Sequence, residues 1–475
     1  MEAFNAKQIS DPVHGTIGLS EIELELVGCP AFQRLRGIKQ LGLANLVFPG
    51  ADYSRFSHSL GVCHIAGRIL SSLVQNNHVS TSELNEHEIQ KYRLAALLHD
   101  VGHYPFSHAM EDALKEHFAD EKLQGEGASN VGSDDYYRHE QVGKQILLND
   151  QDINRILKKQ NFDPETDIAS VILREKPPQF SNLVSSDMDA DRIDYLLRTA
   201  HHTGLPYGSV DLDYLLTQIR VDSEKRVCLT AKALRAAEHF LLCRYFDYQQ
   251  VAYHKTVAGF EWLLKDSLRA LITRGVVKCG ANDVQLMLGN GDWRFFDDSK
   301  IMGLMRDASN DPSFAPSERL KFSAILDRRP PSLVATYRCL LQSNELSNHR
   351  NVQMLLKIRL DDCAKRYGVP RETLHIWTQE GMALTKIGSR IPVSQLGSAT
   401  DDQKDRYQQA VRILSEDGKE SIPIVESKQS LMNILSEYAL YEIRIYVLLP
   451  KGLETMRKVI RDDFLEKLDN TDNWF

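Results

Sequence analysis

Apolar residues recur at three- and four-residue spacing along much of the first half of the chain, as they do in amphipathic helices. This spacing predicts helices at 58–75, 87–100, 108–117, 139–148, 180–199 and 231–272. One region differs, because apolar and polar residues alternate at 218–221 and 226–230 around the polar segment 222–225. That alternation predicts a short β-hairpin among the helices.

Segment 121–138 is rich in Gly, Ser and Asp, which predicts a long loop inserted among the helices. The loop is either a plain surface insertion or a lid over a binding site.

Beyond about residue 275 the pattern becomes mixed. Helical spacing continues at 281–287, 316–326 and 351–366, and alternation is found at 382–387, 422–426 and 442–449. The predicted fold is therefore mainly α: a helical domain at 1–274 with a short β-hairpin, then a smaller C-terminal α+β lobe at 275–475. We expect the lobe to serve packing or oligomerisation.

Length and composition agree with this division. The 475 residues exceed the roughly 250–300 that one hydrophobic core usually organises.

No apolar run reaches the roughly 18–20 residues needed to cross a bilayer, and residues 1–10 lack the pattern of a signal peptide. We therefore expect a cytoplasmic protein with no membrane partner. The seven scattered cysteines form no C-x-x-C pair, which argues against a disulfide framework and a structural zinc site.

The net charge of −8 gives no general attraction to a polyanion, so a phosphate ligand needs a local basic cluster or a metal ion. Histidine indicates where to look, since nine of the 16 histidines fall between His58 and His139. An apolar helical run at 94–98 leads directly into His99 and Asp100, and His103 follows one helical turn later. Nitrogen and carboxylate groups so closely spaced are typical of a divalent metal site.

Two other segments offer further ligands. His58 begins a predicted core helix, with Arg55 one turn before it, where a guanidinium could bind phosphate. Segment 187–194 holds four aspartates between apolar flanks, so at least one carboxylate is expected to point inward and to need a cation.

A series of short motifs then carries a family resemblance. They are DPVHG at 11–15, FQRLRGIKQLG at 32–42, FPG at 48–50, RFSHSLG at 55–61, HDVGHYPFSH at 99–108, HEQ at 139–141, DRIDY at 191–195 and HHTG at 201–204. In this order they resemble the HD-domain deoxynucleoside triphosphate (dNTP) triphosphohydrolases, and the likeness extends to 253–255. It covers the catalytic part of that family only.

The resemblance implies one divalent ion, of Mn, Fe, Mg, Zn or Ni, held by His58, His99, Asp100 and Asp191. It implies that His108, with His103, His139 and Glu111 nearby, protonates or orients the leaving 5′-oxygen. The implied substrate contacts are Arg55, Arg192 and Lys255 to the triphosphate, Gln40, Leu41, Asp189 and Tyr195 around the sugar, and Tyr253 near the triphosphate. Close packing of the pocket around C2′ would exclude ribonucleotides through steric contact with the 2′-hydroxyl.

The chain departs from the family pattern at three places. Arg192 replaces a lysine beside the metal aspartate, and Ala252 stands where a triphosphate-binding tyrosine aligns, with Tyr253 next to it. Gly28 and Cys29 replace an activator-binding aspartate, which argues against a guanine-specific activator site of that form. The remaining candidates for a regulatory nucleotide site are Lys7, Gln33, Arg34 and Arg36, whose alternative role is that of a solvated basic strip.

The leading hypothesis is a dNTP triphosphohydrolase in deoxynucleotide metabolism that forms a homo-oligomer, a tetramer or hexamer by resemblance. One alternative is an HD-type phosphodiesterase or nuclease that acts on nucleic acid or another phosphoester. The other is a regulator that senses nucleotides or binds single-stranded nucleic acid and has a vestigial HD site.

Overall fold

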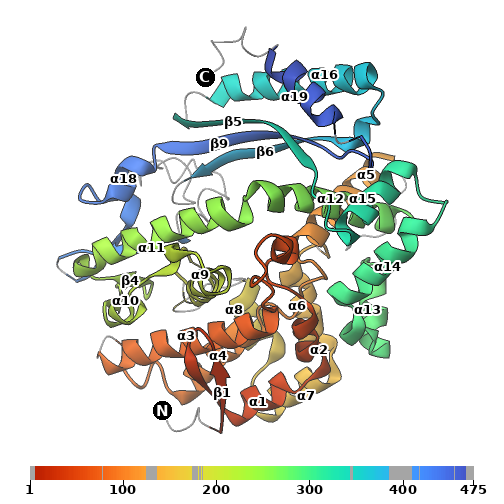
Figure 1. The fold of residues 1–475 in the computed structure, drawn as a ribbon. Coiled ribbons are helices and arrows are strands. Elements are labelled where there is room, and N and C mark those ends of the chain that lie inside the picture. Colours follow the sequence, from red (N-terminus) through yellow and green to blue (C-terminus); the bar gives the residue numbers. More distant parts are fainter. Residues whose placement is uncertain are drawn as a thin grey trace.

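The computed structural model describes residues 6–76, 79–124, 136–173, 180, 183, 186–342, 346–383, 409–416, 418–453 and 455–466. Over these residues the fold is mainly helical, as the sequence predicts, and the strands form three small sheets (Figure 1). No helix in the described part of the chain is long and apolar enough to span a membrane.

The chain begins with a hairpin that the periodicity does not predict. Strand β1 (Lys7–Asp11) pairs antiparallel with β2 (Gly15–Leu19). Gly15 makes the turn at φ 72°, a left-handed conformation that costs glycine little. Short helical segments lead on from this hairpin: α1 (Glu21–Val27), α2 (Pro30–Gln33), η2 (Arg34–Gly37) and η3 (Gly42–Leu46).

Helix α3 (Arg55–Gln75) lies at the centre of the helical part, and α4 (Glu86–Leu98) and α9 (Ala190–Thr203) pack against it (Figure 1). The Ser54 side chain accepts the Ser57 N–H and so begins α3. Asp189 begins α9 in the same way by accepting the Arg192 N–H. This cap explains why α9 starts at residue 190 and not at the predicted residue 180.

The other predicted helices of the first half are also present. Helix α5 (His108–Gln124) is longer than predicted, so the predicted loop 121–138 begins later, and residues 125–135 lie outside the described part. The single predicted stretch 231–272 divides at a π turn, η8 (Tyr248–Ala252), into two helices. The remaining α-helices that the structure describes in this half are α6 (His139–Asn149), α7 (Gln151–Lys159), α8 (Ser170–Leu173), α10 (Leu212–Thr217), α11 (Leu234–Asp247) and α12 (Lys255–Thr273).

The predicted hairpin is confirmed as β3 (Ile219–Val221) and β4 (Val227–Leu229), which pair antiparallel. Its sheet is completed from the far end of the sequence, because β7 (Arg412–Leu414) pairs with β4 and β8 (Ser421–Pro423) pairs with β7. The short helix α18 (Leu431–Leu435) follows this sheet.

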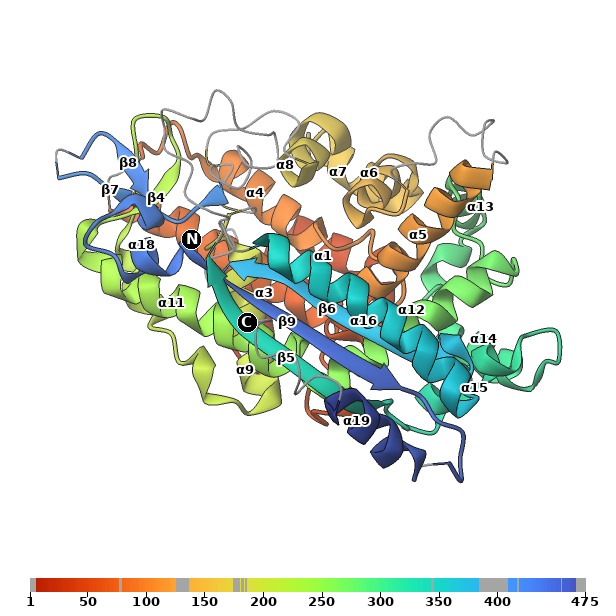
Figure 2. The same ribbon diagram turned by 90° about the horizontal axis from the view of Figure 1, so that it is seen from above.

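The third sheet forms the C-terminal lobe, with order β5-β9-β6 and antiparallel pairing throughout. Its strands are β5 (Ser332–Gln342), β6 (Leu374–Ala383) and β9 (Tyr438–Val447), and α16 (Leu346–Tyr367) and α19 (Met456–Glu466) cover one face (Figure 2). The predicted alternating segment 442–449 overlaps the central strand, β9. The predicted segment 382–387 overlaps the last two residues of β6, and residues 384–387 lie outside the described part.

The larger hydrophobic core continues past residue 274. Trp293 and Phe322 belong to the same buried cluster as Ile17 and Leu60. They come from the region of α13 (Ala281–Asn290), α14 (Asp298–Asn310) and α15 (Pro316–Leu326). These helices therefore pack with the helical first half, whereas the β5-β9-β6 sheet has a small core of its own. The domain boundary at 274 stays a prediction.

Candidate metal centre and active site

Helices α3, α4 and α9 bring together the four residues predicted as metal ligands, here called the quartet: His58, His99, Asp100 and Asp191. His58 lies in the first turn of α3, His99 and Asp100 directly follow α4, and Asp191 lies in the first turn of α9. The His58 Nε2 atom is 2.9 Å from Asp191 Oδ1 and 4.0 Å from Asp100 Oδ2. The His99 Nε2 atom lies 3.2 Å from Asp100 Oδ1 and 4.0 Å from Asp191 Oδ1.

Hydrogen bonds behind the quartet direct the inner imidazole nitrogens toward its carboxylates. His99 Nδ1 donates to the carbonyl of Ala96 at 2.8 Å, and its buried Nε2 makes no hydrogen bond. His58 Nδ1 pairs with Asp194 Oδ2 at 2.7 Å, so its Nε2 also faces the quartet, where it is hydrogen-bonded to Asp191 Oδ1 at 2.9 Å. Two imidazole nitrogens turned toward ionised carboxylates are a donor set that suits a divalent cation. The quartet therefore fits a metal ion.

The carboxylates of the quartet are held in the ionised form. Burial alone would raise the pKa of Asp100, but the charges of Arg55, His99 and His103 outweigh it and lower the pKa well below its usual value. Burial likewise acts against Asp191, and its contact with His58 lowers the pKa overall. Both carboxylates can therefore act as ligands at neutral pH.

A buried network that the sequence analysis leaves unassigned fixes His58 from behind. Asp194 accepts hydrogen bonds from His14 Nε2 at 2.6 Å and from both Nε and Nη2 of Arg198 at 2.9 and 2.8 Å. Arg198 in turn donates to Asp11 Oδ2 at 2.8 Å. A carboxylate behind a ligating histidine sets its ring orientation and tautomer. The motifs at 11–15 and 191–195 are the sequence signal for this network.

A second group, here called the His/Glu cluster, consists of His103, His108, Glu111 and His139. Glu111 accepts from His139 Nδ1 at 2.8 Å and from His108 Nδ1 at 3.1 Å, and lies 3.3 Å from His103 Nδ1. The His103 and His139 rings stack with centroids 3.7 Å apart. Two trios that draw on this cluster, one of them with Asp100, also bring possible metal-ligating atoms within 4.8 Å of one another.

Burial and neighbouring charges shift the pKa values within the cluster. Burial opposes ionisation of Glu111, but its contacts with the three histidines lower its pKa. Burial would lower the pKa of His139, and Glu111 outweighs it and raises the pKa. Burial and the nearby charge of Arg55 lower the pKa of His103 to about 4. The side chain of His108 is 72% exposed and thus accessible to a substrate.

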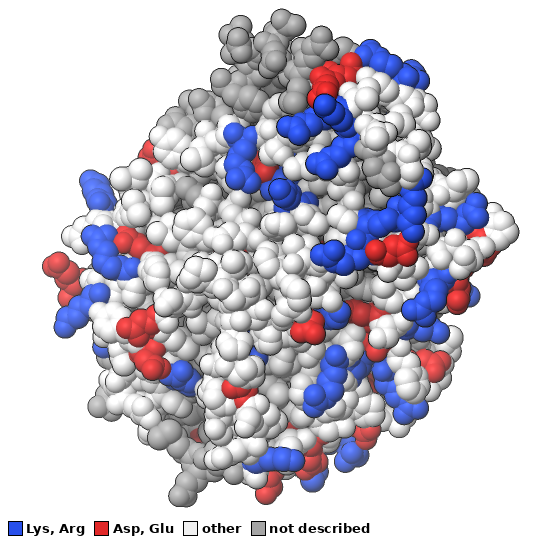
Figure 3. All heavy atoms as spheres, in the orientation of Figure 1, with Lys and Arg blue, Asp and Glu red and all other residues white. Residues whose placement is uncertain are grey.

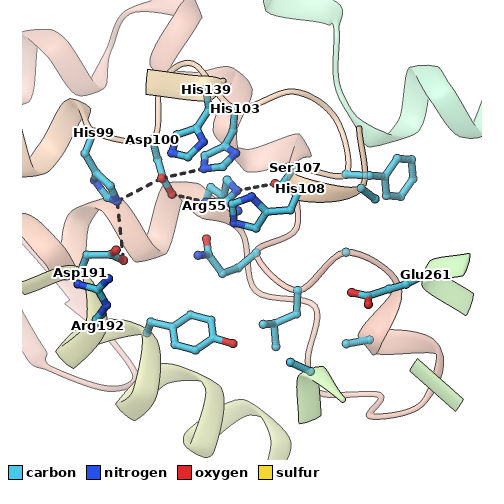
Figure 4. A pocket seen from close by; sticks show the side chains of 18 of the residues that line it. Arg55, His99, Asp100, His103, Ser107, His108, His139, Asp191, Arg192 and Glu261 are labelled. Carbon is cyan, nitrogen blue, oxygen red and sulfur yellow. Dashed lines mark hydrogen bonds and ion pairs between the residues drawn. The ribbon is translucent and has the colours of Figure 1, made fainter. Parts of the chain in front are cut away.

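Arg55 joins the two groups. Its Nη1 donates to Asp100 Oδ2 at 2.6 Å, and its Nε donates to Ser107 Oγ at 2.7 Å, one residue before His108. Figure 4 shows these side chains turned toward one another at one end of a cavity.

The cavity has a volume of about 670 Å³. Six of the eight predicted substrate contacts line it: Gln40, Leu41, Arg55, Asp189, Arg192 and Tyr195. Tyr253 and Lys255 are not among its lining residues; Tyr253 packs against Trp377, and Lys255 is exposed at the start of α12. Glu261, which the sequence analysis does not single out, lies across the cavity from the quartet (Figure 4).

Four of the lining residues, Gln40, Asp189, Arg192 and Tyr195, have surroundings that bear on ligand binding. Asp189 is committed to capping α9, and it also accepts a hydrogen bond from Arg192 Nη1 at 2.9 Å. Burial raises the pKa of Asp189, and it raises the pKa of Tyr195 well above the usual value. The Oε1 atom of Gln40 is buried without a hydrogen-bond partner, so it is available to a ligand.

The four candidates for a regulatory nucleotide site differ in accessibility. Arg34 is buried, donates to the carbonyls of Phe296 and His103 at 2.7 and 2.6 Å, and stacks on Trp293. Its guanidinium therefore holds the fold together. The other three occupy the start of β1 and the region of α2 and η2: Lys7 is exposed, and Arg36 donates to Gln33 Oε1 at 2.8 Å. The activator site stays a prediction.

On the face shown in Figure 3, positively and negatively charged side chains are mixed. Lysine and arginine side chains lie among aspartate and glutamate side chains there. This mixture favours a small ligand over a long polyanion on that face.

Comparison with known proteins supports the family resemblance. Residues 55–198 match the HD domain, and this range runs from α3 to α9 and contains the whole quartet. The uncharacterized protein YwfO of Bacillus subtilis is 35% identical over 260 residues, 54% of each chain. The human deoxynucleoside triphosphate triphosphohydrolase SAMHD1 is 30% identical over 252 residues, 48% of this chain and 38% of its own. The chain spans about half the length of the curated relatives that it matches.

Solved structures show the same fold over nearly the whole chain. A hypothetical protein from Aquifex aeolicus superposes with a TM-score of 0.67 at 25% identity, covering 96% of this chain and 99% of its own. A phosphohydrolase from Bacteroides thetaiotaomicron gives 0.66 at 22% identity, with 93% and 99% covered.

Proposed function

Residues 55–198 form an HD domain, and from this premise we propose that the protein is a metal-dependent phosphohydrolase that cleaves a dNTP into deoxynucleoside and inorganic triphosphate. One observation carries the proposal: three members of the quartet, His99, Asp100 and Asp191, line the same cavity as the three histidines of the His/Glu cluster. The similarity to enzymes named deoxynucleoside triphosphate triphosphohydrolase supports the choice of substrate.

The quartet would hold the divalent ion, which supplies Lewis acidity toward a phosphoryl oxygen and a bound water. Arg55 and Arg192 bring positive charge to the wall beside the quartet, where they would bind triphosphate oxygens. Arg55 would have to share its guanidinium between Asp100 and the substrate, which links substrate binding to the position of that ligand.

The leaving group needs a proton when the bond between the α-phosphorus and the 5′-oxygen breaks. His108 is the exposed histidine of the cluster, and its Nδ1 is hydrogen-bonded to Glu111, which leaves Nε2 to face the cavity. We assign His108 the transfer of this proton to the 5′-oxygen. His139 and His103 would keep Glu111 ionised and oriented.

The remaining walls suit a nucleoside. A volume of about 670 Å³ lies within the roughly 300–1,000 Å³ of small-molecule sites. Gln40 would accept a hydrogen bond from a sugar hydroxyl through its unpaired Oε1, and Leu41 and Tyr195 would close around C2′, which refuses a 2′-hydroxyl by steric contact.

The proposal includes assembly into a tetramer or hexamer and an activating nucleotide at Lys7, Gln33 and Arg36, by analogy with the family. Size-exclusion chromatography with and without dNTPs tests both, since a nucleotide that bridges subunits shifts the elution volume.

The test of the reaction is product analysis. The purified protein is incubated with each dNTP and each NTP, singly and mixed, with Mg²⁺ or Mn²⁺. We expect deoxynucleoside and intact triphosphate from dNTPs only, with His117→Ala on α5 as an active control outside the cavity. Nucleoside monophosphate with pyrophosphate would indicate the phosphodiesterase or nuclease alternative. A metal-loaded protein that turns over no nucleotide would indicate the regulator.

A further inference from the structure

The turn that begins α5 has an unfavourable backbone. Phe106 and Ser107 adopt φ values of 57° and 51°, in the left-handed region that side chains other than glycine rarely occupy. Such a conformation is unfavourable and persists only where neighbouring groups hold it. The turn leads directly into His108, so whatever holds it also places that histidine.

One carboxylate from the second half of the chain holds this turn. Asp298, in the first turn of α14, accepts the Phe106 N–H at 2.7 Å through Oδ1. Its other oxygen, Oδ2, accepts the Lys39 N–H at 2.9 Å. Asp298 is 6% exposed, so both hydrogen bonds are sheltered from water. Lys39 immediately precedes Gln40 and Leu41, which line the cavity together with His108.

Helix capping does not require this carboxylate. The N-cap of α14 is Asp297, whose side chain accepts the Lys300 N–H at 3.0 Å. The Asp298 side chain instead turns away from its own helix to bridge two other segments. The Asp298 carboxylate therefore connects the backbone at Lys39 with the backbone at Phe106.

The surrounding residues make the bridge rigid. Trp293, 2% exposed, lies edge-to-face against Tyr104 and 4.1 Å from the Arg34 guanidinium. Arg34 donates to the carbonyls of His103 and Phe296. Segment 293–298 thus contacts 103–106 at several points, and a displacement of Asp298 cannot be absorbed by its neighbours alone.

We infer that Asp298 is a positioning residue: it fixes the wall at Gln40 and the turn before His108 in one relative position. In terms of the proposed function, on which this inference rests, it sets the sugar contact and the proton donor at the correct separation. A displacement of about 1 Å at such a site costs up to about 100-fold in rate. The second half of the chain thereby takes part in building the active site.

The test compares Asp298→Asn with Asp297→Asn, a matched change one residue away. An asparagine at 298 has one oxygen acceptor, and its amide N–H₂ would face the second backbone N–H. An asparagine at 297 still caps α14. We expect Asp298→Asn to speed amide hydrogen exchange in peptides covering 38–41 and 104–109 and to leave exchange in α9 unchanged. Asp297→Asn should leave exchange in all three regions unchanged.

Turnover and metal content complete the comparison. We expect Asp298→Asn to lower kcat by about 10- to 100-fold with wild-type metal content, because the quartet lies on other elements. Asp298→Glu keeps both acceptor oxygens on a longer side chain, so it should lower kcat by a smaller factor than Asp298→Asn does. If the asparagine variant does not fold, the glutamate variant replaces it, and exchange should still rise at both peptides while kcat falls. Unchanged exchange at both peptides, or altered exchange with unchanged kcat and KM, would overturn the inference. Amide exchange needs no substrate, so a wild-type protein that hydrolyses no dNTP would refute the proposed function while the exchange result still decides whether Asp298 holds the two walls.

Discussion

The quartet and the His/Glu cluster lie side by side, since Asp100 Oδ1 of the quartet is 3.2 Å from His103 Nε2 of the cluster, but their histidines have different surroundings. In the quartet, the outer ring nitrogens are engaged by Ala96 and Asp194, and the inner ones face the carboxylates of Asp100 and Asp191. In the cluster, the histidines are arranged around Glu111. The first arrangement gathers two imidazoles and two carboxylates as a donor set for a cation, and the second supplies protons and an acceptor for them. Histidine content alone therefore does not define a metal site; the partner of the second ring nitrogen does.

Removing a quartet ligand should have the largest effect. His99→Ala takes away an imidazole Nε2 that faces Asp100 and Asp191, so we expect loss of bound metal together with loss of turnover to background. Metal analysis by inductively coupled plasma mass spectrometry and product analysis measure the two. His117→Ala serves as the control, and a His99→Ala protein that keeps its metal would break the distinction between the groups.

Removing the exposed histidine of the cluster should act on rate alone. We expect His108→Ala to keep the metal and to lower kcat by about 10²- to 10⁴-fold, because it removes proton transfer and no ligand. The same metal and product analyses apply. Loss of metal from this variant would mean that the cluster binds the ion.

A substitution behind the quartet should weaken the metal without abolishing it. Asp194→Asn loses the charge that orients His58 Nδ1, and we expect metal affinity to fall by about 10- to 100-fold. Competition with a chelator of known affinity measures this. An affinity equal to wild type would show that Asp194 serves the fold through Arg198 only.

The smallest effect concerns the pH dependence of stability. The folded-state pKa of His139 is raised above its ordinary 6.5, so the stability it contributes is present below about pH 6.5 and is lost as the pH rises through the folded value. The pKa of Glu111 is lowered from 4.5, so its contribution is present above about pH 4.5. Glu111→Gln should therefore lower the melting temperature more at pH 6 than at pH 9, by about 2 °C. Calorimetry at both pH values checks this, and an equal loss at both would contradict the ion pair.

The sequence predicts local structure well where apolar residues keep one spacing. Segment 316–326 matches α15 residue for residue, and the hairpin at β3 and β4 lies where alternation is found. The β1-β2 hairpin escapes prediction because β1 has a single apolar residue, Ile9, and both strands are largely exposed, so no alternation marks them. The start of α9 depends on the cap at Asp189, a local signal that the apolar pattern hides.

In the candidate site, too, some residues can be predicted from the sequence and others cannot. The four quartet residues could be grouped from their motifs, and the structure brings them together. Asp298 carries no such signal, because it lies 192 positions from Phe106 in the chain and their contact exists only through tertiary packing. Arg34 shows the converse: a basic residue in a motif, expected at a ligand site, is buried against Trp293.

The central claim is that the quartet, and not the His/Glu cluster, holds the divalent ion. A crystal structure of the protein prepared with Mn²⁺, with anomalous scattering measured at the manganese edge, tests this directly. We predict a peak bounded by the Nε2 atoms of His58 and His99 and by the carboxylates of Asp100 and Asp191. A peak among His103, His108, Glu111 and His139 with none in the quartet would contradict the claim.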